Sequence, residues 1–215
     1  MDGVEIPAVL RSLITTPVAH ELAKTYTDQV VFPEKLVIDR PDDPHRRFPG
    51  WPTAVLVIAD ENQGVCSWGV PLGEPEPRVL VGGELEGINS TVVYAPDVAS
   101  YLAARRWDYG SLDREPLLQA QADPLDEASL AHLRAGFDEQ PRTHGWPGHT
   151  QFRFQRDGVK ILLWSGTDQC DWWLSAVDEA RLAEAAARLV DLSDLRTSLW
   201  ANDIAGEALL ERLTS

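Results

Sequence analysis

The stretch VLVIADENQGVCSWGV, residues 55–70, decides the fold of the first half of the chain. Val55 to Ile58 is an unbroken apolar run, which is typical of a strand buried on both faces. Polar residues follow at 60–64 and end in a glycine, which adopts positive φ at little cost. A second apolar run, Val65 to Val70, carries Trp68 in its middle. We therefore predict a buried hairpin whose turn presents two carboxylates and two amides to solvent, and a loop of this kind is a place for a binding surface.

The segments on either side of this hairpin predict helices before and after a sheet of about four strands. The expected elements are helices at 5–14 and 18–26, strands at 36–38, 78–81 and 91–94, and a helix at 96–107. Residues 39–53, DRPDDPHRRFPGWPT, hold four prolines and mixed charges and predict a long exposed loop. The order of these elements predicts an α+β domain over residues 1–110.

The second half, residues 111–215, predicts a smaller α-βββ-α domain after a linker at 108–123. Asp123 is expected to cap a helix that runs to about Ala135, and a polar loop is expected at 138–149. Three strands of a meander follow at 150–156, 159–164 and 169–175, with Asp157-Gly158 as a two-residue hairpin turn between the first two. Helices at 175–191 and 206–213 complete the domain. Trp172 and Trp173 are neighbours on one strand, so one indole should face away from the buried side of the sheet and be covered or offered to a partner.

Acidic residues outnumber basic ones throughout the chain, which has a net charge of −15 over 215 residues. Residues 1–110 hold 9 Lys and Arg against 16 Asp and Glu, a net of −7, and residues 111–215 hold 10 against 18, a net of −8. A field of this sign repels nucleic acid and anionic lipid and attracts basic partners with faster association. The alternative interpretation is that the charge serves solubility alone.

The two cysteines, Cys66 and Cys170, lie far apart in the sequence and form no CxxC motif. Reduced, buried thiols are the simplest prediction, and a disulfide between them is the alternative. The N-terminal residues show no basic-then-apolar signal, and no segment approaches the ~20 apolar residues of a membrane span. We expect a cytoplasmic protein.

No catalytic or cofactor motif is present: the chain lacks GxSxG, SxxK, GxGxxG and phosphate-loop patterns. His144 and His149, in HGWPGH, could hold zinc if a third ligand arrived from elsewhere, but their spacing is not that of HExxH. Asp60 and Glu61 could form an acid–base pair, yet adjacent residues on a strand point to opposite faces. We therefore predict no catalytic residue, no metal and no cofactor.

The first half resembles the SUKH superfamily, the Smi/Knr-type fold of bacterial immunity proteins and some eukaryotic regulators. The resemblance is carried by IPAVLRSL (6–13), FPEKLVID (32–39), DENQGVCSWGV (60–70) and DVASYLAARRW (97–107). It implies a helical N-terminal region, then a sheet with a polar turn before an aromatic strand, and a protein without catalysis that neutralises a cognate toxin by binding it. On this resemblance Glu61, Asn62, Gln63 and Gly64 form the turn, and Trp68 is a structural aromatic.

The leading hypothesis is thus an immunity-type protein whose acidic surface meets a basic toxin. The candidate contacts fall on predicted turns of one sheet: Glu61, Asn62, Gln63, Glu74, Glu76, Glu84 and Glu86. One alternative is a regulatory or scaffold protein that binds a cellular protein unrelated to toxins. A second is a metal-dependent hydrolase that uses His144 and His149.

Overall fold

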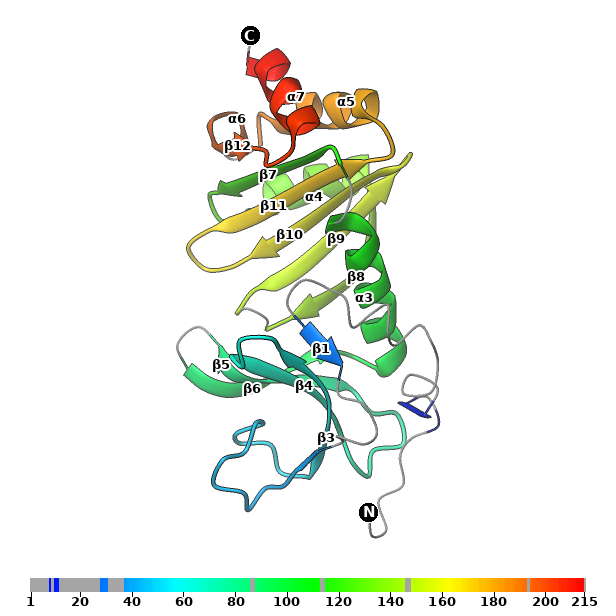
Figure 1. Ribbon diagram of the computed structural model, residues 1–215, viewed down its shortest axis with the longest axis vertical. Helices are drawn as coiled ribbons and strands as arrows, with labels where there is room; N and C mark the ends of the chain where they lie inside the picture. The colour runs from blue at the N-terminus through cyan, green and yellow to red at the C-terminus, as the bar shows by residue number, and fades with distance from the viewer. Residues whose placement is uncertain are drawn as a thin grey trace. The chain divides into compact units, whose positions relative to one another are not determined.

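A computed structural model of the chain describes residues 8, 10–11, 28–30, 37–85, 88–112, 115–145, 148–192 and 194–214 (Figure 1). The chain divides into two compact units. Unit 1 comprises residues 1–109 and 143–148, and unit 2 comprises residues 110–142 and 149–215. Both units combine helices with antiparallel sheets, so the predicted α+β class is confirmed.

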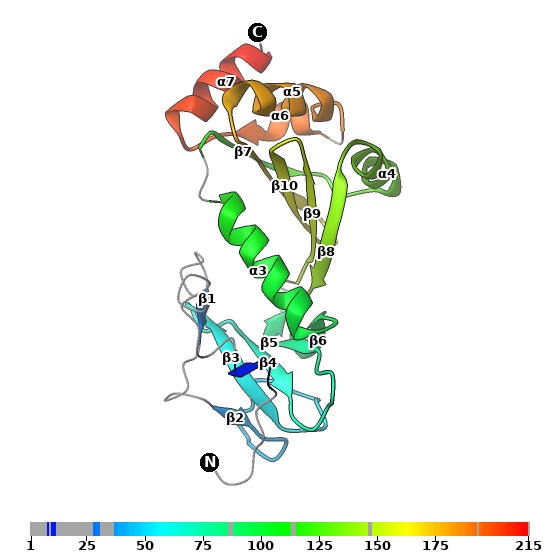
Figure 2. The same cartoon turned by 90° about the vertical axis from the view of Figure 1, so that its right-hand side faces the viewer.

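Unit 1 is built on an antiparallel sheet in the order β1-β3-β4-β5-β6, with β2 pairing to β3. The strands are β1 (Asp28–Val30), β2 (Ile38–Asp39), β3 (Val55–Glu61), β4 (Cys66–Pro71), β5 (Val79–Leu85) and β6 (Ile88–Ala95). The predicted hairpin of residues 55–70 is the β3–β4 pair (Figure 2). Strand β5 runs on through Gly82 and Gly83 to Leu85, so the strand predicted at 78–81 is too short.

One face of this sheet packs against helix α3 (Val98–Leu112). Trp68 is fully buried there, and its ring meets Tyr94 edge-on at 6.0 Å between centroids. The guanidinium of Arg105 lies 5.5 Å from the Trp68 ring centre, which adds a cation–π contact to the apolar packing. The predicted helix of 5–14 falls mostly outside the described residues, but Leu10 is helical and buried in this core. The predicted helix of 18–26 lies outside the described residues.

The opposite face of the same sheet is covered by residues 40–53, hereafter the proline-rich loop. Phe48 is fully buried and packs with Val55, Val57 and Leu80. The prediction of an exposed loop is therefore wrong at its centre. An apolar sheet face exposed to water would raise the free energy of the folded state, and the aromatic side chain of the loop covers this face.

Unit 2 is built on a six-stranded sheet in the order β12-β7-β11-β10-β9-β8. The strands are β7 (Leu117–Ala122), β8 (Asp138–His144), β9 (Thr150–Arg156), β10 (Val159–Ser165), β11 (Cys170–Ala176) and β12 (Leu199–Trp200). The predicted meander is confirmed as β9, β10 and β11. Figure 1 shows these three strands side by side, with β7 next to β11. Two predictions are wrong: the linker of 108–123 contains the end of α3 and all of β7, and the polar loop of 138–149 contains β8.

The helices of unit 2 bury one face of this sheet in a single core. They are α4 (Glu127–Gly136), α5 (Glu179–Leu189), α6 (Leu195–Ser198) and α7 (Ile204–Thr214). Asp126, not Asp123, caps α4, because its side chain accepts the Ser129 N–H at 2.7 Å. Asp178 caps α5 in the same way, so the helix predicted at 175–191 begins only at Glu179.

The turn between β9 and β10 has the predicted form, since Asp157 and Gly158 both have positive φ, at 51° and 83°. The prediction for the paired tryptophans is confirmed as well. Trp172 is fully buried in the core, whereas Trp173 faces the other side of the sheet and contacts Trp164. No helix within the described ranges is long and apolar enough to cross a membrane.

Candidate functional site

The turn between β3 and β4 is held together by the carboxylate of Glu61. Its Oε2 atom accepts the backbone N–H of Gln63 at 2.7 Å and that of Val65 at 3.3 Å. Gly64 has φ of 77°, a conformation that favours glycine, and its N–H donates to the Glu61 carbonyl at 3.0 Å. Glu61 is only 7% exposed, so the expectation that both carboxylates of this stretch face solvent is wrong for it. The exposed side chains of the turn are those of Asn62, Gln63 and Val65.

Asp60 belongs to a separate polar network on the face covered by the proline-rich loop. A bulge after Val57 places Asp60 opposite Ser67. The Ser67 hydroxyl donates to the Asp60 carboxylate at 2.6 Å, and the Arg47 guanidinium donates to both residues. The two neighbouring carboxylates thus serve different networks, as the strand geometry predicts, and they do not form an acid–base pair.

The proline-rich loop is fixed at its base by the buried carboxylate of Asp39. This side chain accepts the backbone N–H of Arg47 at 2.6 Å and that of Phe48 at 3.4 Å. It also lies 3.9 Å from the Nε atom of Arg46. A buried carboxylate needs such partners, because an unpaired charge in the interior is strongly unfavourable.

Two glycines open the space into which the loop packs. A Cβ atom at Gly69 would lie 2.5 Å from the ring of Phe48. A Cβ atom at Gly82 would lie 2.4 Å from the Arg47 carbonyl oxygen and 2.7 Å from the Phe48 ring. Side chains at these two positions would therefore push the loop off the sheet.

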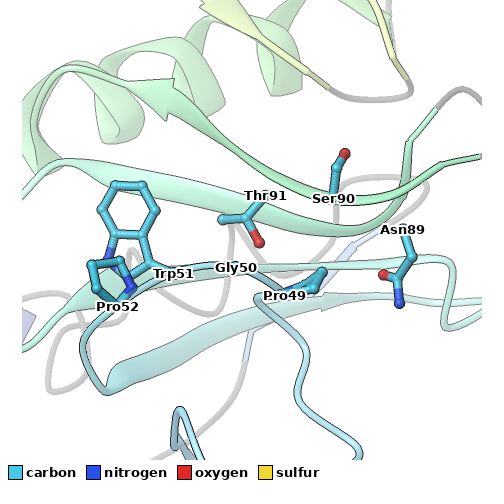
Figure 3. Close-up of a pocket in the computed structure, with 7 residues that line it drawn as sticks. All are labelled: Pro49, Gly50, Trp51, Pro52, Asn89, Ser90 and Thr91. Atoms are coloured by element: carbon cyan, nitrogen blue, oxygen red, sulfur yellow. The ribbon is translucent and has the colours of Figure 1, made fainter.

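A pocket of about 520 Å³ lies between the proline-rich loop and strand β6 (Figure 3). It is lined by Pro49, Gly50, Trp51, Pro52, Asn89, Ser90 and Thr91. Figure 3 shows Trp51 and Pro52 together at one end and Asn89 at the other, with the side chains of Ser90 and Thr91 on opposite sides of their strand. Its size falls within the range of small-ligand sites in proteins.

Two polar atoms of this pocket's lining are left without partners. The Trp51 Nε1 atom and the Thr91 Oγ1 atom are buried and make no hydrogen bond with the described residues. A buried polar group in this state costs about 1–3 kcal/mol relative to a satisfied one. The register runs Asp60, Ser67, Gly82, Thr91 across four strands, so the pocket and the Asp60 network lie in one row of the sheet.

The other predicted contact residues are split between the two ends of the sheet. Glu74 and Glu76 follow β4, at the end opposite the 62–65 turn, because antiparallel strands reverse direction. Glu74 pairs with Arg78 at 3.2 Å. Glu84 lies within β5, opposite Asn89, not on a turn, and Glu86 falls outside the described residues. The structure therefore does not gather these carboxylates into one patch.

The described residues supply no third ligand for a metal site at His144 and His149. His144 is the last residue of β8 and is counted with unit 1, whereas the rest of β8 up to Arg142 and His149 belong to unit 2. The Nδ1 atom of His149 is buried without a hydrogen-bond partner among the described residues. Over the same part of the chain, no group of three His, Cys, Asp or Glu side chains is placed to hold a metal ion.

Both cysteines are free and buried, as predicted. Burial, followed by the negative charges of Glu61 and Asp60, raises the pKa of the Cys66 thiol well above its usual range. Burial also raises the pKa of the Cys170 thiol, to about 12. Neither thiol is an activated nucleophile, because the reactive form is the thiolate.

Sequence reasoning missed Arg47, Phe48 and Trp51 as site residues, since it assigned their segment to an exposed loop. The signal that could have found them is the presence of two aromatic residues in RRFPGW, since large aromatic side chains are highly buried on average and are unusual in a solvated linker. A comparison of the chain with protein-family models, curated proteins and solved structures finds no match.

Proposed function

We propose that this chain is a non-catalytic, immunity-type protein that binds a basic protein toxin and blocks it. The observation that carries the proposal is the net charge of −15, which is divided almost equally between the two halves of the sequence. The resemblance of residues 6–107 to the SUKH superfamily points the same way. No sequence motif calls for catalysis.

The charge distribution supports binding by long-range attraction. Several carboxylates are already used within the fold: Glu61 holds a turn, Asp60 meets Arg47 and Glu74 meets Arg78. The remaining excess of negative charge is not compensated by the 19 basic residues of the chain. Such an excess accelerates the encounter with a positively charged partner, and the effect weakens as salt rises.

For the contact surface we propose the end of the unit 1 sheet that carries the 62–65 turn, together with the pocket beside β6. Asn62 and Gln63 are exposed there. A partner group that enters the pocket and accepts a hydrogen bond from Trp51 Nε1, or exchanges one with Thr91 Oγ1, would satisfy atoms that the chain leaves unpaired. These hydrogen bonds would lower the free energy of the bound state relative to the free state.

The test is affinity capture from a lysate of the cells that produce the protein, with salt as the variable. The proposal predicts a basic protein that is retained at low salt and released as salt rises. The captured protein, expressed alone, should be toxic to these cells, and co-expression of the present chain should restore growth. A captured protein that is harmless, or that stays toxic in the presence of the chain, would refute the immunity-type function.

The contact surface is tested separately with a matched pair of variants. Gln63→Lys adds a positive charge at the proposed end of the sheet, and Ala99→Lys adds the same charge at an exposed position of α3, which follows the opposite end of β6. A like charge within about 4 Å of a partner charge costs about 1 kcal/mol in water, which is roughly fivefold in rate. We expect Gln63→Lys to slow association by up to that factor and Ala99→Lys to change it much less. Equal effects would remove the surface from the proposal.

A further inference from the structure

The second face of the unit 2 sheet carries two tryptophans next to a carboxylate that has no ion-pair partner among the described residues. Trp164 on β10 and Trp173 on β11 are both partly exposed, and their ring centres lie 4.7 Å apart with the planes tilted by 56°. The register places Asp171 directly opposite Trp164, and Asp171 lies two residues before Trp173 on the same strand. All three side chains therefore belong to one face of the sheet.

The carboxylate of Asp171 is positioned by amides. Its Oδ1 atom accepts a hydrogen bond from Gln121 Nε2 at 3.3 Å, and Gln169 Nε2 lies 3.5 Å from both carboxylate oxygens. Neutral amides orient the carboxylate but leave its charge in place. Within the described structure no Lys or Arg forms an ion pair with Asp171, whereas Asp138, Asp178 and Asp191 of the same unit each have an arginine partner.

We propose that Trp164, Trp173 and Asp171 form a binding site for the guanidinium group of an arginine side chain on a protein partner. Two tilted indole faces attract a cation through their negative π-surfaces, and a planar guanidinium stacks on such faces. The carboxylate at the rim supplies the opposite charge and a hydrogen-bond acceptor that matches the guanidinium donors. The negative charge of residues 111–215 adds attraction at longer range.

An arginine explains the chemistry of this face better than a sugar does. A saccharide stacks on aromatic rings and can donate hydroxyl hydrogen bonds to a carboxylate, but it carries no positive charge to pair with Asp171, whereas a guanidinium supplies both the donors and the charge. The site rests on the proposed function for one point, namely that the partner is a basic protein. It adds the chemical group of that partner which this face would bind. Its chemistry can nevertheless be tested without that partner.

The test is a titration of the full chain with N-acetyl-arginine N-methylamide, followed through the eight tryptophan indole N–H signals in a ¹H–¹⁵N spectrum. The signals of Trp164 and Trp173 are assigned with the single variants Trp164→Phe and Trp173→Phe. The matched control ligand is the citrulline analogue, which has nearly the same shape as arginine but no charge. We expect the arginine compound at low salt to shift these two indole signals in a saturable way and the citrulline compound to leave them unchanged.

Two carboxylate variants then separate the site from the general charge of the protein. Asp171→Asn keeps the shape of the side chain and should weaken binding about tenfold, whereas Asp168→Asn, at an exposed position of the same β10–β11 turn, should change it less than twofold. Equal losses in the two variants, equal shifts with citrulline, or no shift of either indole in a folded protein would overturn the proposal. Saturable shifts with a neutral oligosaccharide such as maltohexaose, but not with arginine, would assign the site to carbohydrate instead.

The result of this test does not depend on the result of the test of the proposed function. Specific arginine binding in a protein that captures no basic partner would refute the proposed function and leave the site in place. A basic partner that binds a chain lacking arginine affinity at Trp164 and Trp173 would refute the site alone.

Discussion

Removal of the Phe48 side chain tests whether the proline-rich loop packs on the sheet of unit 1. Phe48 is fully buried against Val55, Val57 and Leu80. A buried aromatic side chain covers about 150–250 Å², which at about 25 cal/mol per Å² corresponds to about 4–6 kcal/mol. Truncations of buried phenylalanine to alanine typically cost about 3–5 kcal/mol. We expect Phe48→Ala to lower the free energy of unfolding of unit 1 by about 3–5 kcal/mol.

The assay is urea unfolding combined with hydrogen exchange of peptides from β4 and β5, which report on unit 1. With a slope of about 2 kcal/mol per molar urea, the midpoint should fall by about 1.5 M or more. Asp42→Ala is the control, because Asp42 is an exposed residue of the same loop, and its effect should stay within about 0.5 kcal/mol. A loss below about 1 kcal/mol for Phe48→Ala, similar to that of the control, would show that the loop is solvated and that the pocket beside it does not exist in solution.

Three further outcomes follow from the packing, the thiols and a helix cap. Gly82→Ala places a Cβ atom 2.4 Å from a loop carbonyl and should destabilise unit 1 by about 1–3 kcal/mol. Gly136→Ala is the control, because open space surrounds this position, and it should not destabilise the protein. Equal effects of the two variants in urea unfolding would contradict the close packing. Because the pKa values of Cys66 and Cys170 are raised, both thiols should resist alkylation by iodoacetamide at about pH 8 until the protein unfolds, and fast labelling of the native protein would contradict their burial. A backbone N–H bond in the first turn of α4 lowers the pKa of Asp126, so its stabilising effect is present above the ordinary carboxyl pKa and is lost as pH falls through the lowered value. Asp126→Asn should therefore flatten the acid side of the stability curve, and a curve identical to that of the wild type would contradict the role of the cap.

Local signals in the sequence are sufficient for the hairpins. The β3–β4 pair follows from two apolar runs around a polar turn, and the β9–β10 pair follows from Asp157-Gly158. Both features depend on residues adjacent in the chain. The strand β7 carried a usable signal too, since Leu118, Ala120 and Ala122 alternate with exposed or half-exposed residues. The pattern is nevertheless weak, because two of these three buried residues are alanines, which are depleted in strands.

Long-range packing is what the sequence could not reveal. Phe48 is buried because Gly69 and Gly82, on two other strands, leave room for it, and no pattern within residues 39–53 reports on those glycines. The cap of α4 was placed three residues early because DPLDEAS offers two aspartates, and only the contact of Asp126 with the Ser129 N–H decides between them.

The turn at 62–65 could be predicted from the sequence, but its internal contacts could not. Glu61 proves to be a structural acceptor within the turn, and the pocket beside β6 depends on residues of the proline-rich loop. The separation of Glu74 and Glu76 from the turn follows from strand direction. A contact surface inferred from acidic turns alone therefore mixes two ends of one sheet.

The central claim is that the negative charge of this chain drives binding to a basic partner. The most direct measurement is the association rate constant between the purified chain and its captured partner, determined by stopped-flow fluorescence as ionic strength is raised. The claim predicts a rate constant that falls steeply with salt, while the dissociation rate constant changes little. An association rate constant that is independent of salt would contradict it.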